Sequence, residues 1–120
     1  MKPKYHLFNN AKYALEGIVA LFKNESSFRI ELYIIIPAII FSFFLKISFL
    51  EHLFLVGVLF LILIVEALNS ALEACVDLIT NEWHPKAKMA KDCASAAVFL
   101  AVLLALFVWG FVLIRLFYAL

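Results

Sequence analysis

The chain has 120 residues, of which 67% are hydrophobic, and its formal net charge at pH 7 is +1. A soluble domain is only about 45–50% apolar, and a chain this short has too small an interior to hide the excess. The composition therefore excludes an ordinary soluble domain and predicts one integral membrane domain over residues 1–120. The near-neutral charge gives no indication of nucleic acid as a partner.

The N-terminal region, residues 4–22, is predicted to form an amphipathic helix. Apolar residues recur there at helical spacing (Leu7, Ala11, Ala14, Ile18 and Phe22), and polar residues fill much of the remaining surface (Lys4, Asn9, Lys12 and Glu16). This pattern is typical of a helix that lies on the membrane surface. A short helix that packs on a partner protein would show the same pattern, so both interpretations stay open.

Three membrane-spanning helices are predicted to follow, over about 28–48, 53–79 and 94–116. The last contains 21 uncharged residues in a row, enough to cross a bilayer. The first two contain uncharged runs of 14 and 13 residues. Such runs cover only about 20 Å of a hydrocarbon core about 30 Å thick, so charged residues must enter the membrane or its interface. The predicted fold class is all-α, with three spans and one surface helix.

Two polar segments are expected to join the spans. Lys46, Glu51 and His52 mark a short loop after the first span, and residues 80–91 form a polar connection before the third. Lys46 and Arg115 lie on one side of the predicted membrane, and all other Lys and Arg residues lie on the opposite side, in the N-terminal region and the 77–93 loop. The positive-inside rule then places the N-terminus and this loop in the cytoplasm.

Polar side chains follow one face of the second span. They are separated by 3, 4 and 4 residues and form a single stripe: Glu66, Asn69, Glu73 and Asp77. Because the preceding uncharged run is so short, Glu66 must lie within the bilayer while Glu73 comes near the interface. Polar stripes can simply join helices by hydrogen bonds. An acid inside the membrane is costly unless it is paired or protonated, however, which favours a functional role for Glu66 as a general base.

The neighbouring residues make phosphoryl transfer a plausible chemistry. Glu73 and a second carboxylate such as Glu25 could hold Mg²⁺, with phosphate and water as the other ligands. Lysines of the 86–91 segment could neutralise a triphosphate. A simpler interpretation is that Lys86 and Lys88 only follow the positive-inside rule.

At this point the sequence resembles a known family. The motifs E-A-L-N-S-A-L-E-A-C-V-D at 66–77, N-E-W-H at 81–84 and A-K-D-C-A-S-A-A-V at 90–98 are similar to those of the bacterial diacylglycerol kinases, with support from N-E-S-S-F-R-I-E at 24–31 and from Tyr13. These are small trimeric membrane kinases unrelated to soluble kinases. The resemblance covers almost the whole chain.

The resemblance implies a role for each matching residue. It makes Glu66 the general base, supported by Asn69, and gives Asp77 a structural role. The implied metal ligands are Glu25 and Glu73. The implied ATP contacts are Tyr13, Glu25, Glu73, Glu82, Trp83, His84, Lys91 and Asp92, and the implied lipid contacts are Arg29, Glu31, Glu66, Ser95 and Trp109. His6, Glu16 and Val19 depart from the family pattern, which affects only the N-terminal headgroup contacts.

The expected function is that of an ATP- and Mg²⁺-dependent kinase that converts diacylglycerol to phosphatidic acid. The resemblance implies a homotrimer with shared sites, in the bacterial inner membrane. One alternative is an undecaprenol kinase of the same family, favoured by the run from His84 to Lys88. Two others are a small proton-coupled transporter that uses Glu66 as its carrier group and a structural subunit of a larger complex.

Overall fold

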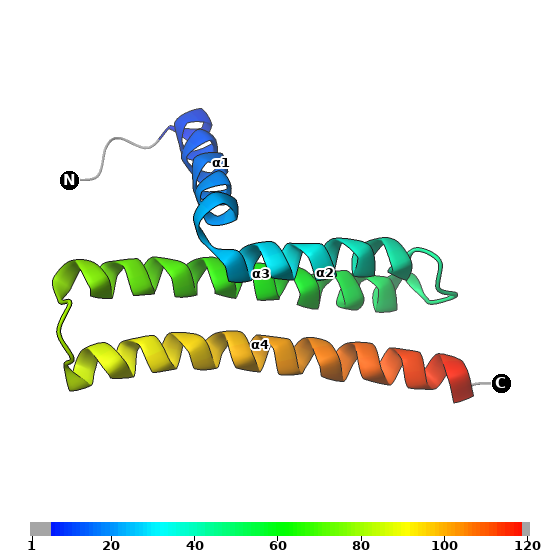
Figure 1. Cartoon of the computed structure of the whole chain (residues 1–120). Helices are drawn as coiled ribbons and strands as arrows, with labels where there is room; N and C mark the ends of the chain where they lie inside the picture. Colours follow the sequence, from blue (N-terminus) through cyan, green and yellow to red (C-terminus); the bar gives the residue numbers. More distant parts are fainter. Residues whose placement is uncertain (1–5, 119–120) are drawn as a thin grey trace.

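The computed structural model describes residues 6–118, and every regular element in this range is a helix (Figure 1): α1 (Leu7–Asn24), α2 (Ser26–Ser42), α3 (Phe49–Ile79) and α4 (Pro85–Tyr118). The predicted all-α fold class is confirmed. Residues 4 and 5, which the sequence assigns to the amphipathic helix, lie outside the described residues. Lys2 and Lys4, which count toward the positive-inside rule, also lie outside them.

Helices α2, α3 and α4 form the body of the molecule. α3 and α4 run antiparallel along their whole lengths, α2 lies along the first half of α3, and α1 points away from all three (Figure 1). The core is apolar and joins the three helices through Ile35, Val58, Leu59, Ile62, Ala101 and Ala105. Alanines on α4 allow its backbone to approach α3 closely, as small residues do between membrane helices.

Helix α3 begins earlier than predicted. The Ser48 hydroxyl accepts the Glu51 N–H at 3.1 Å, and a Glu51 carboxylate oxygen accepts the Ser48 N–H at 3.0 Å. This reciprocal pair is a capping box, which satisfies N–H groups that a helix start leaves without partners. Glu51 and His52 therefore belong to the helix, and the expectation that they mark a loop is wrong.

Helix α4 also begins earlier than predicted. The connection after α3 covers only 80–84, whereas the sequence predicted a polar connection to residue 91. Pro85 is the first helical residue, a position that suits its fixed φ and its missing N–H. The His84 Nδ1 accepts the Lys86 N–H at 3.1 Å. The lysines of this segment thus lie on an ordered helical turn.

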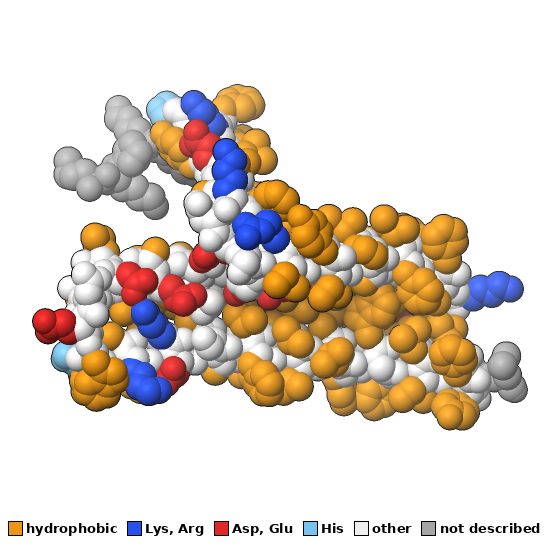
Figure 2. Space-filling model, viewed as in Figure 1, with side chains coloured by type: hydrophobic (Ala, Val, Ile, Leu, Met, Phe, Trp, Pro, Cys, Tyr) orange, Lys and Arg blue, Asp and Glu red, His pale blue; other side chains and the backbone are white. Residues whose placement is uncertain are grey.

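The two longest helices reach beyond the thickness of a membrane. α3 has 31 residues and α4 has 34, and both are apolar enough to cross a bilayer. At 1.5 Å per residue they are about 46 and 51 Å long, against a hydrocarbon core of about 30 Å. Charged side chains gather at the end where α3 passes to α4, whereas hydrophobic side chains cover most of the remaining length (Figure 2). α2 has 17 residues, or about 26 Å, and its crossing stays a prediction.

At the opposite end, polar contacts fix α4 to α3. The Arg115 guanidinium donates to both Glu51 carboxylate oxygens, at 2.8 and 2.9 Å. The Trp109 indole N–H donates to the Leu55 carbonyl at 3.1 Å. These contacts join α3 and α4 at the end that lies away from their connection.

Candidate active site

Two acids of α3 are joined by an amide that lies between them. The Asn69 side-chain N–H₂ donates to Glu66 Oε2 at 3.3 Å and to Glu73 Oε1 at 3.1 Å. Glu66 is only 3% exposed, whereas Glu73 is half-buried nearer the charged end. The single stripe expected from the spacing therefore exists, and its first two acids share one hydrogen-bond donor.

A third acid meets this pair from a neighbouring helix. The Glu31 carboxyl on α2 lies close enough to the Glu66 carboxyl for the two acids to interact. Among residues 6–118, one oxygen of Glu31 and the side-chain oxygen of Asn69 are buried and have no hydrogen-bond partner. Buried acceptors in native proteins normally have a donor. Two such atoms beside Glu66 mark a position that can receive a hydroxyl group.

An open cavity of about 720 Å³ lies at the charged end, between the end of α3, the connection and the start of α4. Its lining includes most of the residues implied as ATP contacts: Glu82, Trp83, His84, Lys91 and Asp92. Asp77 and Lys88 also line it. The structure therefore brings together residues that the sequence separates into two motifs.

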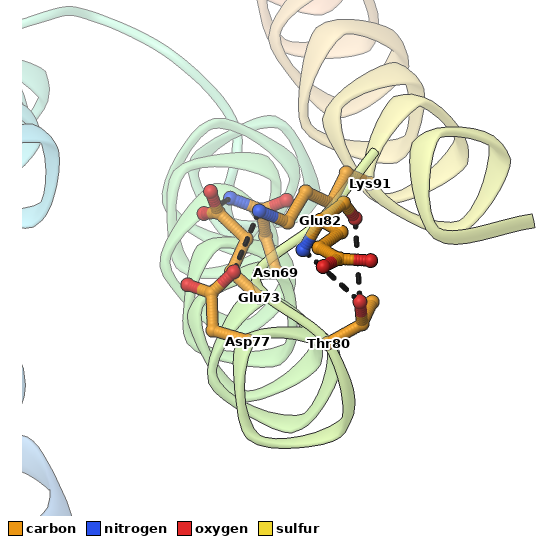
Figure 3. A network of polar contacts seen from close by, with 6 residues as sticks. All are labelled: Asn69, Glu73, Asp77, Thr80, Glu82 and Lys91. Atoms are coloured by element: carbon orange, nitrogen blue, oxygen red, sulfur yellow. Dashed lines mark hydrogen bonds and ion pairs between the residues drawn. The ribbon is translucent and has the colours of Figure 1, made fainter. Parts of the chain in front are cut away.

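Lys91 and Asp77 form an ion pair at this cavity, with the Lys91 Nζ 2.7 Å from Asp77 Oδ1 (Figure 3). Lys91 precedes the uncharged part of α4. The hydrogen bond to Asp77, with the negative charges of Asp77 and Glu73, raises the pKa of Lys91 above its ordinary value of 10.5. Lys91 is therefore a permanent cation at neutral pH, as a phosphate contact must be.

The short connection presents its aromatic residue to solvent. The Thr80 hydroxyl accepts the Glu82 N–H at 3.1 Å and donates to the Glu82 carbonyl at 3.3 Å, which closes a tight turn (Figure 3). The next residue, Trp83, is 75% exposed and lines the cavity. An exposed planar side chain next to this turn offers a surface on which a nucleotide base can stack.

The N-terminal residues implied as ATP contacts lie elsewhere. Tyr13 is exposed on α1, and neither Tyr13 nor Glu25 is among the described residues that line the 720 Å³ cavity. Glu25 instead lines a separate cavity of about 560 Å³ with Ser70 and small residues of α1 and α3. The single chain thus divides the implied nucleotide contacts between two places.

The residues implied as lipid contacts are also divided. Glu31 and Trp109 line an apolar cavity of about 320 Å³ between α2, α3 and α4. Ser95 is exposed on α4. The Arg29 guanidinium donates to backbone carbonyls at the end of α1.

Sequence reasoning missed two features of the site. It did not pair Asp77 with Lys91, although these residues bond each other and both line the cavity; the structural role that the resemblance implies for Asp77 stays a prediction. The i+14 separation of this pair has no periodic signal, because it depends on how α4 turns back on α3. It also missed the pairing of Glu31 with Glu66, which only the packing of α2 on α3 creates.

The fold and the site define an all-helical protein that has two helices fit to cross a membrane. Its acids lead from a buried position toward the end of the bundle where a cavity is lined by both acids and lysines. The family model described as prokaryotic diacylglycerol kinase matches residues 12–113. A diacylglycerol kinase of Haemophilus influenzae is 40% identical over 108 residues, which cover 90% of this chain and 92% of that protein. A diacylglycerol kinase of Pseudomonas aeruginosa is 39% identical, over 90% of this chain and 88% of that protein. One of Escherichia coli is 37% identical, over 82% of this chain and 81% of that protein.

The chain belongs to the prokaryotic diacylglycerol kinase family. The resemblance seen in the motifs is thereby confirmed, and with it an ATP-dependent kinase activity toward a lipid. The names of the relatives do not favour the transporter or the undecaprenol kinase.

Proposed function

We propose that this enzyme transfers the terminal phosphate of ATP to diacylglycerol, giving phosphatidic acid and ADP. The observation that carries the proposal is the line of contacts from Glu66, through Asn69, to Glu73. These contacts join a buried acid to the charged end of the bundle. We take them to mark the route along which phosphate passes from a water-soluble nucleotide to an alcohol in the membrane. Family membership supports the reaction, and the buried acid supports the place where it occurs.

The lipid half of the site lies beside Glu66. Diacylglycerol carries one hydroxyl group, which we place among the carboxyl groups of Glu66 and Glu31 and the side-chain oxygen of Asn69, where its single proton is donated to Glu66. The 320 Å³ apolar cavity, which Glu31 also lines, suits the hydrocarbon next to that headgroup. Glu66 takes the hydroxyl proton as general base while the lipid oxygen bonds to phosphorus. Ser95 and Trp109 complete the proposed lipid contacts.

The nucleotide half lies in the 720 Å³ cavity. Lys91 and Lys88 supply positive charge for the phosphates, and Trp83 supplies a stacking face for the base. Glu82, His84 and Asp92 are proposed to contact the remainder of ATP, with Tyr13 reaching it from α1. Phosphoryl transfer needs little covalent help from the protein, so position and charge account for most of the catalysis.

We propose Mg²⁺ as the cofactor, held by Glu25 and Glu73. Glu73 uses one oxygen to accept the Asn69 bond and keeps the other for a ligand. No group of three or more metal-binding side chains exists among residues 6–118. Two carboxylates nevertheless fit Mg²⁺, which is usually bound by one or two carboxylates with phosphates and waters as the other ligands. When bound, the ion neutralises charge that develops on the transferred phosphate.

The membrane arrangement is part of the proposal. α2 is taken as a third span that is completed at its ends by interfacial residues, and α1 as the surface helix. The N-terminus and the connection between α3 and α4 lie in the cytoplasm, on the inner membrane of a bacterium. A homotrimer that shares sites between subunits would let Tyr13 and Ser95 meet groups that they do not meet among the described residues of one chain.

The test measures phosphate transfer from labelled ATP by the purified chain in nanodiscs. Diacylglycerol and undecaprenol are compared in the same nanodiscs, with diacylglycerol expected to be the better acceptor. Lys91→Ala should raise the KM for ATP about tenfold or more, because it removes a charge-assisted contact to phosphate, while the KM for the lipid stays unchanged. Transfer only to undecaprenol, or wild-type KM for ATP in Lys91→Ala, would contradict the proposal.

A further inference from the structure

A single residue separates the surface helix from the bundle. α1 ends at Asn24 and α2 begins at Ser26, so Glu25 alone forms the elbow, with extended backbone angles (φ −116°, ψ 107°). Within the described part of the chain, no side-chain hydrogen bond caps α2 at Glu25. Figure 1 shows α1 leaving the bundle at this point. The direction of α1 therefore depends on what holds this elbow.

Arg29 forms hydrogen bonds to the end of α1 through its side chain and to Glu25 of the elbow through its backbone. Its Nη1 donates to the Phe22 carbonyl at 2.7 Å and to the Lys23 carbonyl at 3.1 Å. Its backbone N–H donates to the Glu25 carbonyl at 3.3 Å. The last carbonyls of a helix lack partners within the helix and carry partial negative charge, so a cation at this position satisfies and stabilises them. One side chain of α2 thus closes the end of α1.

The elbow also determines where the Glu25 side chain lies. Glu25 lines the 560 Å³ cavity against Ser70 of α3. Ser70 directly follows Asn69, which bonds Glu73. Any rotation of α1 about the elbow would move Glu25 relative to this part of α3.

We infer that Arg29 is a positioning residue for the metal and nucleotide half of the site, acting through Glu25, and not a contact for the lipid. The inference rests on the proposed function in one respect, the role of Glu25 as a metal ligand. Loss of the guanidinium frees the end of α1 and lets Glu25 depart from its place beside α3. Binding of the divalent cation with the nucleotide then weakens, while the lipid cavity lined by Glu31 and Trp109 is unaffected.

Three variants separate this role from a headgroup contact. Arg29→Met keeps the length of the side chain but removes its donors. Arg29→Lys keeps donors on one nitrogen, and one nitrogen makes both observed side-chain bonds, so it should restore most of the wild-type behaviour. Lys23→Gln is the matched control, because it removes a cation from the same helix end but none of these bonds.

The first measurement is Mn²⁺ binding with a non-hydrolysable ATP analogue, followed by electron paramagnetic resonance. Arg29→Met should weaken Mn²⁺ binding about tenfold, as expected for loss of hydrogen bonds made by a charged group, and Arg29→Lys and Lys23→Gln should remain near wild type. The second is hydrogen exchange of the Glu25 amide, which bonds the Leu21 carbonyl at 2.9 Å and should exchange faster in Arg29→Met alone. The KM for the lipid should not change.

Unchanged Mn²⁺ binding and unchanged exchange in Arg29→Met would overturn the inference. A higher KM for the lipid with normal Mn²⁺ binding would also overturn it, in favour of a headgroup contact. These results are distinct from failure of the proposed function. If the wild-type chain transfers no phosphate to diacylglycerol, the proposed function fails, while Mn²⁺ binding and exchange still decide the role of Arg29.

Discussion

Replacing Asn69 by leucine removes the donor that joins Glu66 to Glu73 while it nearly preserves the volume of the side chain. Both bonds have a carboxylate as acceptor, and such bonds contribute about 1.5–3 kcal/mol each. The 3.3 Å bond to Glu66 is longer than an ordinary N–H···O bond, so the lower value applies to it. The two bonds together then amount to at least about 3 kcal/mol. If the transition state depends on them by about 3 kcal/mol more than the bound ground state does, kcat falls roughly 100-fold, since 1.36 kcal/mol corresponds to a factor of ten.

The assay is steady-state phosphate transfer to diacylglycerol in nanodiscs, with thermal unfolding of each variant as a check on folding. Asn69→Gln keeps the donor and should lose less activity than Asn69→Leu. Asn69→Asp places a third acid between the first two and should be as impaired as Asn69→Leu or more so. A folded Asn69→Leu variant with kcat within about threefold of wild type would refute the reasoning, because each lost bond should exceed that effect.

Three further predictions concern other parts of the molecule. Glu31→Leu removes both carboxylate oxygens beside Glu66, where the lipid hydroxyl is proposed to lie, so the KM for diacylglycerol should rise about tenfold; an unchanged KM would contradict the proposed lipid contact. Trp109→Phe removes the hydrogen bond from the indole N–H to the Leu55 carbonyl. It should lower the free energy of unfolding by about 1 kcal/mol and leave kcat unchanged. A large loss of kcat would show instead that the indole N–H acts in the reaction. The pKa of Lys91 is raised in the folded state, so its pairing with Asp77 stabilises the fold fully below pH 10.5 and this stabilisation is lost as pH rises through the higher folded-state pKa. The melting temperature should therefore fall in strongly alkaline solution. In Asp77→Asn, the part of this fall that is due to the ion pair should disappear.

The parts of the structure that follow from helical periodicity were predictable from the sequence. The stripe on α3 depends only on residues three and four apart on one helix, and the hydrogen bonds of Asn69 agree with it. The long apolar runs of α3 and α4 likewise identified helices able to cross a membrane. These features need no knowledge of how the helices pack.

Other features depend on contacts that leave no local pattern. Glu31 meets Glu66 only because α2 packs on α3, and Lys91 meets Asp77 only because α4 turns back at residues 80–84. Arg29 bonds backbone carbonyls, which every residue possesses, so no side chain marks its partner in the sequence. The sequence does not predict the early start of α4, because the lysines of this segment are typical of a polar connection, although Pro85 is well suited to a first helical turn.

The central claim is that Glu66 takes the proton from the lipid hydroxyl, and Glu66→Gln tests it most directly. General-base catalysis contributes about 10²- to 10⁴-fold, so kcat for diacylglycerol should fall by at least about 100-fold. Binding of Mn²⁺ with the ATP analogue should persist in this variant, because Glu73 and the 720 Å³ cavity are intact. A Glu66→Gln enzyme that binds the nucleotide and still transfers phosphate at a rate near wild type would contradict the account.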